Sequence, residues 1–472
     1  LVPLIILKVT FKFGVYCAII FEVMSLLQKD KLSSLNIRIL TWNLNKVDFR
    51  PGILSPAEFH MSPKEVEKLD IIVIGFQEGN FLSLKYLYNM FCIGNPWGNQ
   101  FKDFLSSYGF VQLTCNHPSG VFMMGLSLVI FLKRHLLSLV KSVQVKYIRS
   151  GFYGLLGHKG TLCIHLNFTN GTHTVLLNSH CTPHADKLAR REIECEEVMR
   201  KCNFKPNCTL TSEDDFSFVF WFGDLNFRVD GLTKDEVKRH LDNRNYSELL
   251  KYDQLNECKS ENAALKEFNE AKIEFAPTYK FKPGEKNELN FSRIPSYCDR
   301  ILWRTADYCC ESSCHVPNCT IKKYTSVEQV CCSDHKAVLA DFKIQCPLNV
   351  SSPEIYFCNS DGSEFNNCWY VKENSVCSFF EPNNYKAGFS DWIGLYEIGF
   401  SSDLDVVTWK YVFSKWVNRK SEKGVYQNVL FLGKFLVKTG KYQLGYYSQS
   451  SRCLRALSNP FQIVSRDEKK KD

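Results

Sequence analysis

The stretch from Phe220 to Arg228, FWFGDLNFR, puts polar side chains at the end of an apolar run. Residues 216–222 have the composition of a buried strand, which Gly223 interrupts. Asp224 and Asn226 follow two residues apart, so in an extended or tightly turning chain their side chains point the same way. A carboxylate beside a carboxamide can accept a proton from a water and orient it. The alternative interpretation is an Asx-rich turn after a core strand.

Other predicted strands also end on polar side chains. Apolar or alternating runs at 36–43, 70–76 and 175–180 predict strands, and a further strand is expected within 333–342. Burying polar groups at strand ends is costly unless they converge on a site. We therefore predict that the ends of these strands, together with the end of the strand at 216–222, form an active site at one rim of a sheet sandwich. The residues at these ends are Asn43, Glu78, His180, Asp224/Asn226 and Asp334/His335.

These residue types suit phosphate chemistry that depends on a metal ion. Glu78 with Asn43 beside it suits a hard cation such as Mg²⁺. His180 and His335 could donate to phosphoryl oxygens or protonate a leaving group, and Asp299 could orient a histidine. Cations that could bind further phosphates are Lys159, Lys280 and Arg293.

Each of these residues, taken alone, has an ordinary structural explanation. Glu78 could be a strand-end charge, His180 a satisfied core histidine and Lys159 a solvated loop lysine. The ordered set along the chain favours the active site over these separate explanations.

Composition places the chain among intracellular globular proteins. The 472 residues suggest two or three domains, and the net charge of +8 fits anionic partners such as phosphates or acidic membrane surfaces. The 21 cysteines cannot all pair within one chain and are interpreted as mostly reduced. The cluster at Cys309, Cys310, Cys314, His315 and Cys319 lacks the paired spacing of a zinc site, so a thiol-rich loop is favoured.

The first 35 residues are expected to lie outside the fold. The chain begins with Leu1, and Met24 offers a plausible start. The apolar stretch 13–27 contains Glu22 and is short for a membrane span, so no membrane segment is predicted.

The remaining pattern divides the chain into two domains and a tail. Helices are expected at 97–107, 185–202 and 232–255, and prolines and serines mark a boundary near 345–353. We assign residues 36–346 to the first domain and 354–465 to a small β-sandwich, with a charged tail at 466–472. Strands of the sandwich are expected at 368–371, 375–380, 392–396, 434–437 and 442–447.

The ordered motifs resemble those of the inositol polyphosphate 5-phosphatases, within the endonuclease/exonuclease/phosphatase superfamily. They span residues 36–345, and the most specific are WFGDLNFR and PSYCDRILW. The matching motifs are TWNLN (41–45), Gln77-Glu78, GHKG (157–160), NSHCTPH (178–184), WFGDLNFR (221–228), PTYKF (277–281), PSYCDRILW (295–303) and SDHKAV (333–338).

The resemblance implies a four-layer αββα sandwich and Mg²⁺-dependent removal of the 5-phosphate from phosphoinositides or soluble inositol phosphates. It implies that Glu78 binds Mg²⁺ with Asn43 and Asp334 nearby. Asp224 would activate water that Asn226 orients, His180 would hold the scissile phosphate, and His335, oriented by Asp299, would stabilise its charge. Expected substrate contacts are His158, Lys159, Tyr279, Lys280, Arg293, His184 and Arg300.

The C-terminal segment, with DWIGLY at 391–396, resembles a SKICH domain. That resemblance implies an Ig-like β-sandwich that serves localisation, so residues 24–346 are expected to act alone on a soluble substrate. A monomer is expected in the cytoplasm, recruited to membranes and open to a protein partner through this domain. Two positions depart from the family pattern: His158 stands where the family has Asn, and Phe291 stands where it has Lys.

Two other functions remain open on the sequence. A nuclease of the same superfamily would use the same metal and histidine set, although PTYKF and PSYCDRILW and the lack of a long basic stripe argue against nucleic acid. A non-catalytic phosphoinositide-binding scaffold is expected to have lost a catalytic residue, and none of the set is missing.

Overall fold

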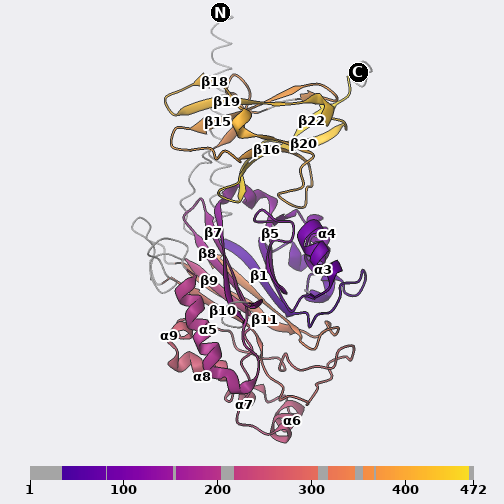
Figure 1. The fold of residues 1–472 in the computed structure, drawn as a ribbon, viewed down its shortest axis with the longest axis vertical. Coiled ribbons are helices and arrows are strands. Elements are labelled where there is room, and N and C mark those ends of the chain that lie inside the picture. Colours follow the sequence, from indigo (N-terminus) through magenta and orange to yellow (C-terminus); the bar gives the residue numbers. More distant parts are fainter. Residues whose placement is uncertain are drawn as a thin grey trace, which may run out of the picture.

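Two stacked β-sheets form the N-terminal domain of this protein (Figure 1). The computed structural model describes residues 34–80, 82–151, 156–202, 217–306, 317–345, 355–365 and 368–466. The first sheet contains, in spatial order, β11 (Asn318–Val327), β12 (Ala337–Gln345), β1 (Ser34–Asn43), β2 (Ile71–Gln77), β5 (Leu126–Lys133) and β3 (Phe110–Leu113), with β4 (Val121–Met123) also paired to β5. The second contains β10 (Asp299–Thr305), β9 (Phe218–Asp224), β8 (His173–His180), β7 (Leu156–Phe168) and β6 (Val140–Gly151).

Alternate residues of each strand pack on opposite faces of its sheet. Ile37 and Ile39 of β1 belong to the core between the sheets, whereas Leu40 and Trp42 pack under the outer layer. Trp221 of β9 likewise faces outward. Both faces of each sheet are therefore buried, which explains the nearly continuous apolar runs in the sequence.

Helices cover the outer face of each sheet, on opposite sides of the molecule in Figure 1. The first sheet is covered by α4 (Pro96–Ser106), and the second by α5 (Leu188–Lys201), α8 (Gln254–Glu261) and α9 (Ala263–Lys266). The predicted αββα sandwich is confirmed. The other helices and helical turns are η1 (Pro56–Phe59), α2 (Pro63–Val66), α3 (Leu84–Tyr88), η2 (Asn89–Ile93), η3 (Arg134–Leu139), η4 (Ala185–Lys187), α6 (Lys234–Asp242) and α7 (Tyr246–Leu250).

The strand register brings the polar strand ends to one rim. β8 and β9 are parallel, with His180 opposite Asp224, and β10 runs antiparallel to β9, with Asp299 opposite Asp224. In the other sheet, β1 ends at Asn43 beside the end of β2. These residues come from distant parts of the sequence, and the topology alone places them together.

The C-terminal domain is a β-sandwich. One sheet contains β13 (Tyr356–Cys358), β15 (Ser375–Pro382), β19 (Gly424–Phe431) and β18 (Trp416–Lys420). The other contains β14 (Cys368–Tyr370), β22 (Phe461–Val464), β20 (Gly440–Ser448), β16 (Trp392–Glu397) and β17 (Thr408–Tyr411), with β21 (Cys453–Leu457) paired to β20. The remaining short helices are η5 (Val412–Ser414) and η6 (Gly433–Phe435).

One predicted strand of this domain is wrong. Residues 433–435 form a 3₁₀ turn instead of a strand at 434–437. Gly433 lies so close to the backbone of Lys372 that a Cβ would meet it at 2.4 Å, and this close approach interrupts the extended chain. The predicted strands at 368–371, 375–380, 392–396 and 442–447 are present within one to three residues.

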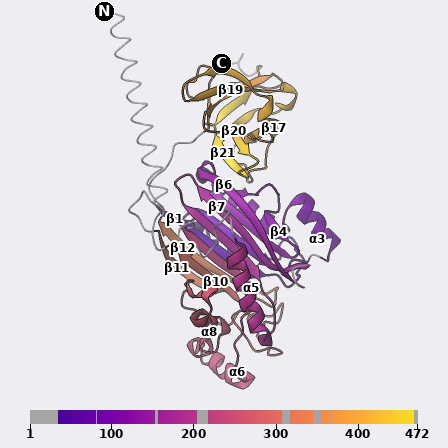
Figure 2. The ribbon, with the colours of Figure 1, turned by 60° about the vertical axis from the view of Figure 1, so that its left-hand side comes forward.

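The two domains share one hydrophobic core at the end of the sandwich opposite the polar rim (Figures 1 and 2). Val140, which pairs with Phe168 at the far end of β7, accepts a hydrogen bond from Cys453 of β21. Tyr396 and Tyr447 of the C-terminal domain are buried in the core that the two sheets enclose. The C-terminal domain therefore packs against the first domain and does not contribute to the rim.

Two sequence expectations concern membranes and metal. Within the described ranges, no helix is both long enough and apolar enough to cross a bilayer. The cysteine-rich loop considered as a zinc site lies mostly at residues 307–316, outside the described residues, and so does nearly all of the N-terminal segment 1–35. β1 begins at Ser34, two residues before the expected start.

Candidate active site

His180 lies between two carboxylates at the rim. Its Nε2 is 3.4 Å from Oε1 of Glu78 and 3.4 Å from Oδ2 of Asp224, and His180 and Asp224 are both buried. Lys159 also reaches this point, where its Nζ contacts Nε2 of His180. Burial opposes ionisation of Glu78, but His180 and Lys159 hold its pKa at about 2. Burial likewise opposes ionisation of Asp224, and His180, His335 and Lys159 nonetheless keep the pKa of Asp224 well below its usual range.

A glycine is required next to Asp224 for a steric reason. Gly223 has φ +135°, and a Cβ there would lie 2.0 Å from the carbonyl oxygen of Ser179. Only glycine allows β9 to approach β8 this closely. Glu78 and Asn226 also have positive φ, at 51° and 58°. Backbone strain of this kind is typical of residues held for function.

Asp224 also belongs to a second cluster, with Asp299 and His335. Oδ2 of Asp299 is 2.8 Å from Nδ1 of His335 and accepts a 2.7 Å hydrogen bond from Thr278. Burial opposes protonation of His335, but Asp299 and Asp224 raise its pKa to about 9. At neutral pH this histidine is therefore a cation that faces the rim with its orientation held by Asp299.

Two amide side chains orient Asp224 and its surroundings. Nδ2 of Asn43 donates a 2.8 Å hydrogen bond to Oδ2 of Asp224, and the backbone N–H of Asn226 donates to Oδ1 at 3.1 Å. The Asn226 amide donates to the carbonyl of Cys181 at 3.0 Å, while its Oδ1 accepts from Arg228. Both oxygens of the Asp224 carboxylate therefore accept hydrogen bonds that fix its orientation.

The donor set fits a small divalent cation. Two groups of three side chains each bring their ligand atoms within 4.8 Å of one another. The first group is Glu78, His180 and Asp224, and the second is Asp224, Asp299 and His335. Asp334, also predicted near the metal, belongs to neither group in the described chain. Its Oδ2 is 3.4 Å from Nζ of Lys280.

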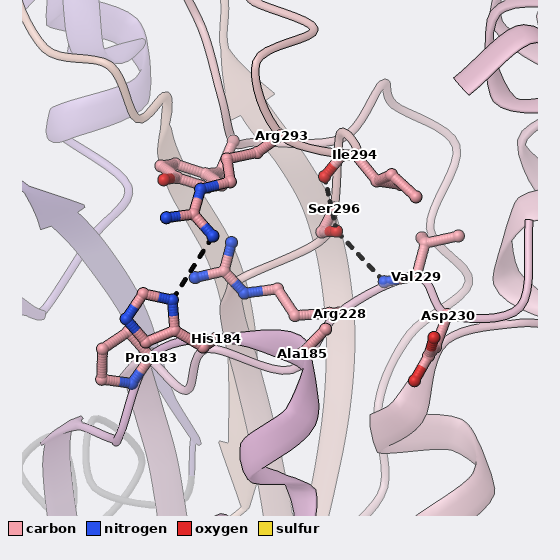
Figure 3. A pocket seen from close by; sticks show the side chains of 10 residues that line it. Pro183, His184, Ala185, Arg228, Val229, Asp230, Arg293, Ile294 and Ser296 are labelled. Atoms are coloured by element: carbon pink, nitrogen blue, oxygen red, sulfur yellow. Dashed lines mark hydrogen bonds between the residues drawn. The ribbon is translucent and has the colours of Figure 1, made fainter. Parts of the chain in front are cut away.

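A cavity of about 160 Å³ opens beside the clusters (Figure 3). Arg228, Arg293 and His184 line it, with Nη1 of Arg293 3.4 Å from Nδ1 of His184. Arg228 stacks 4.6 Å over the ring of Tyr279, and that ring lies 4.5 Å from the His335 ring. The cavity is therefore cationic and continuous with the second cluster.

Most of the predicted substrate contacts lie at this rim, but Arg300 does not. Arg300 is fully buried and pairs with Asp253 at 2.7 Å and Glu270 at 2.6 Å. Neighbouring residues of a strand point to opposite faces, so Asp299 faces the rim and Arg300 faces away. The prediction for Arg300 is wrong for this reason. His158 lies on β7, and its side chain falls outside the described residues.

The sequence interpretation gave no role to several buried polar residues, although they lie within its motifs. Gln77 donates to Asn178 at 2.7 Å and to Thr41 at 3.0 Å, which joins the two sheets directly behind the site. Arg228 was also missed, although it ends the WFGDLNFR motif. Its place in that motif was the available signal, whereas nothing in the sequence shows that Gln77 meets Asn178.

The comparisons with known proteins identify the family of each domain. The profile of the endonuclease/exonuclease/phosphatase family 2 matches residues 40–341, and that of the SKICH domain matches residues 364–463. Inositol polyphosphate 5-phosphatase K of Mus musculus is 28% identical over 93% of this chain and 92% of its own length. Phosphatidylinositol 4,5-bisphosphate 5-phosphatase A of Homo sapiens is 30% identical over 90% of this chain, which spans only 41% of that relative.

Solved structures agree on the fold. The inositol polyphosphate 5-phosphatase domain of SPsynaptojanin, in complex with inositol (1,4)-bisphosphate and calcium, has a TM-score of 0.53 and 23% identity over 68% of this chain and 89% of its own. Cimex nitrophorin in its ferrous NO complex has a TM-score of 0.51 and 19% identity over 66% of this chain and 99% of its own. Because such different proteins share the fold, function has to be argued from the site. The profile match over residues 40–341, together with the rim geometry, confirms the resemblance found in the motifs: the chain belongs to the endonuclease/exonuclease/phosphatase family 2 and resembles its inositol polyphosphate 5-phosphatases over nearly its whole length.

Proposed function

We propose that this protein hydrolyses the 5-phosphate of phosphoinositides, such as phosphatidylinositol 4,5-bisphosphate and 3,4,5-trisphosphate, and of soluble inositol polyphosphates. The single observation that carries the proposal is the sharing of Asp224 by two clusters, Glu78–His180 and Asp299–His335, beside a cationic cavity. The names of the relatives, which are phosphoinositide and inositol polyphosphate 5-phosphatases, support the same substrate class.

The metal we propose is Mg²⁺, held by Glu78 with Asn43 and Asp334 nearby. When bound, it would supply positive charge to the phosphoryl oxygens. The oxygen-rich donor set supports a hard cation. The calcium in the related SPsynaptojanin complex supports a divalent ion without identifying which one.

The side chains of the site have separate roles in the proposed reaction. Asp224 accepts the proton of the attacking water, and the Asn226 amide orients that water. Because the pKa of Asp224 is low, the proton moves only as the bond from the water oxygen to phosphorus forms and the bond from phosphorus to the inositol 5-oxygen breaks. The released 5-oxygen takes up a proton from the solvent and becomes a hydroxyl group of the inositol ring. His335, cationic and held by Asp299, donates to a phosphoryl oxygen, as does His180. Arg293, His184 and Tyr279 bind a phosphate on the neighbouring ring carbon.

We also propose that the protein works in the cytoplasm and is recruited to an anionic membrane. Next to Glu78, α3 and its flanking turns expose large apolar side chains, Leu84 and Tyr88 among them at 84% and 61%. On the C-terminal domain, Trp409, Tyr411 and Phe413 are exposed around β17, beside Lys410. In Figure 2, α3 and β17 lie on the same side of the molecule. Aromatic side chains with adjacent lysines favour the interface of a bilayer.

A phosphate-release assay tests the activity. The full chain with Mg²⁺ is incubated with a panel of inositol lipids and soluble inositol phosphates, with Asp224→Asn as the inactive control. Release of phosphate only from substrates with a 5-phosphate supports the proposal. Nicking of plasmid DNA without that release would instead identify a nuclease.

Co-sedimentation with vesicles that contain phosphatidylserine, compared with neutral vesicles, tests the proposed binding to an anionic membrane.

A further inference from the structure

Arg191 of α5 is a buried cation close to, but not lining, the cationic cavity. Its side chain has no exposed surface, and it makes no ion pair with any carboxylate in the described part of the chain. Burying a guanidinium without a counter-charge is unfavourable unless its donors are used. Its contacts show where they are used.

The guanidinium holds the loop that carries His184. Nη1 donates to the carbonyl of Thr182 at 3.2 Å and to that of His184 at 2.6 Å, and Nη2 reaches the carbonyl of Ala185 at 3.4 Å. The plane of the group lies 5.4 Å over the ring of Phe227. Contacts from one rigid fork to three carbonyls within four residues fix the path of this loop in a way that a lysine ammonium could not reproduce.

Gln254, the first residue of α8, joins this loop to the opposite wall of the cavity. Its Oε1 accepts from Nη2 of Arg191 and from the backbone N–H of Arg228. Its Nε2 donates to the carbonyl of Ala185 and to Oδ2 of Asp230, each at 3.0 Å. Ala185, Arg228 and Asp230 all line the cavity. One buried pair of side chains therefore sets the spacing of two cavity walls.

His184 depends on this support. It has φ +78°, a conformation that non-glycine residues adopt only when their surroundings hold them there. Its side chain projects into the cavity toward Arg293 (Figure 3). Among the described residues, the carbonyl of His184 accepts one other hydrogen bond, a longer one of 3.3 Å from the backbone N–H of Lys187, so the 2.6 Å bond from Arg191 is its shorter contact.

We infer that Arg191, acting with Gln254, is a positioning residue that sets the spacing of His184 and Arg228 for a phosphate next to the scissile one. It touches neither the substrate nor the reacting atoms. This inference rests on the proposed function of the cavity, and it adds a residue that sets specificity among inositol phosphates from outside the binding site.

Steady-state kinetics on two soluble substrates test the inference. Inositol 1,4,5-trisphosphate carries the neighbouring phosphate, and inositol 1,5-bisphosphate lacks it. We expect Arg191→Gln to raise KM for the trisphosphate by about tenfold, with kcat within about threefold and KM for the bisphosphate nearly unchanged, because the lost contact acts on binding. Arg191→Lys, which keeps the charge and loses the fork, should give an intermediate KM. Arg200→Gln on the exposed face of α5 is the matched control and should match the wild type.

A double-mutant cycle separates positioning from general loss of structure. If Arg191 acts through the His184 loop, Arg191→Gln should add little to the KM increase of His184→Ala on the trisphosphate. Equal losses on both substrates, or full additivity with His184→Ala, would overturn the inference. Should Arg191→Gln not fold, Gln254→Ala must give the same substrate-selective rise in KM, and an unselective effect there overturns it. A wild-type protein inactive on both substrates would instead refute the proposed function.

Discussion

The backbone N–H of Thr114 in the N-terminal domain donates a 3.1 Å hydrogen bond to Oδ1 of Asp403 in the C-terminal domain. Asp403 has no exposed surface, and its Oδ2 has no hydrogen-bond partner among the described residues. Burial raises the pKa of this carboxyl to about 7, against the smaller opposing effect of the Thr114 bond. A titratable group thus lies inside the junction of the two domains, far from the rim.

The first prediction is that this carboxyl makes stability depend on pH. In the unfolded chain its pKa returns to about 3.9, so between roughly pH 4 and 7 the folded state holds a proton that the unfolded state has lost. Stability should therefore fall as pH rises through this window, by on the order of a few kcal/mol for this group. Asp403→Asn removes the titration, and its melting temperature relative to wild type should rise from pH 5 to pH 8.

Differential scanning fluorimetry across that range measures the effect. Asp405→Asn is the matched control, since Asp405 is an exposed carboxylate two residues away. If the melting temperatures of wild type and Asp403→Asn changed in parallel with pH, the carboxyl would not be buried at the junction as described.

A second prediction concerns separation of the domains. The sequence suggests that residues 24–346 act alone, but the structure buries Tyr396, Phe400 and Tyr447 of the C-terminal domain in the core of the first. Backbone hydrogen bonds also cross the junction, as from Gln112 to Ser401 at 2.8 Å. Removing the C-terminal domain should expose that core and lower the melting temperature by about 5 °C or more.

The site itself lies at the opposite rim, so truncated protein that remains folded should keep kcat on a soluble substrate within about threefold. Calorimetry and phosphate release on residues 24–346 and on the full chain measure both quantities. An unchanged melting temperature in residues 24–346 would show that the junction contributes little to the stability of the first domain. A folded but inactive fragment would show that the second domain supports the rim.

A third prediction tests Asp224 as the base. Asp224→Asn keeps the size of the side chain and removes its negative charge, so kcat should fall on the order of a hundredfold or more, the usual contribution of a positioned base. Asp242→Asn, an exposed carboxylate at the end of α6 that does not line the cavity, is the control and should keep most of kcat. Near-normal turnover in Asp224→Asn would remove Asp224 from this role.

The site residues that could be predicted from the sequence are the polar residues that directly follow apolar strands. Asp224 and His180 follow buried runs, and the strand order then needs only to bring those ends together. Arg300 was wrongly assigned to the substrate because it follows Asp299 in the motif, although alternation along β10 turns its side chain to the opposite face. Arg191 and Gln254 could not be predicted at all, because their partners are carbonyls of a loop whose path they themselves determine.

A fourth prediction concerns the metal. Chelation with EDTA should abolish phosphate release, and Mg²⁺ should restore it. Glu78→Gln keeps the shape of the side chain and removes the charge, so the Mg²⁺ concentration for half-maximal activity should rise by about tenfold or more. Glu196→Gln, on the exposed face of α5, is the control. Full activity of the wild type in excess chelator would contradict a metal at Glu78.

The last prediction comes from Phe291, a position where the resemblance to the inositol polyphosphate 5-phosphatases implies a lysine. Phe291 is partly buried and lies on the turn that also carries Arg293, one residue after Asn290, whose N–H donates to the carbonyl of Lys280 at 2.7 Å. A lysine at this position would add a cation close to the phosphate that Arg293 is proposed to bind. A charge-assisted hydrogen bond contributes about 1.5–3 kcal/mol. Phe291→Lys should therefore lower KM for phosphatidylinositol 4,5-bisphosphate by roughly tenfold or more, with little change in kcat, because the contact is the same in ground and transition states. Phe291→Met, which keeps an apolar side chain, is the matched control and should leave KM near the wild-type value. An unchanged or raised KM in Phe291→Lys would mean that this position does not face the neighbouring phosphate in this protein.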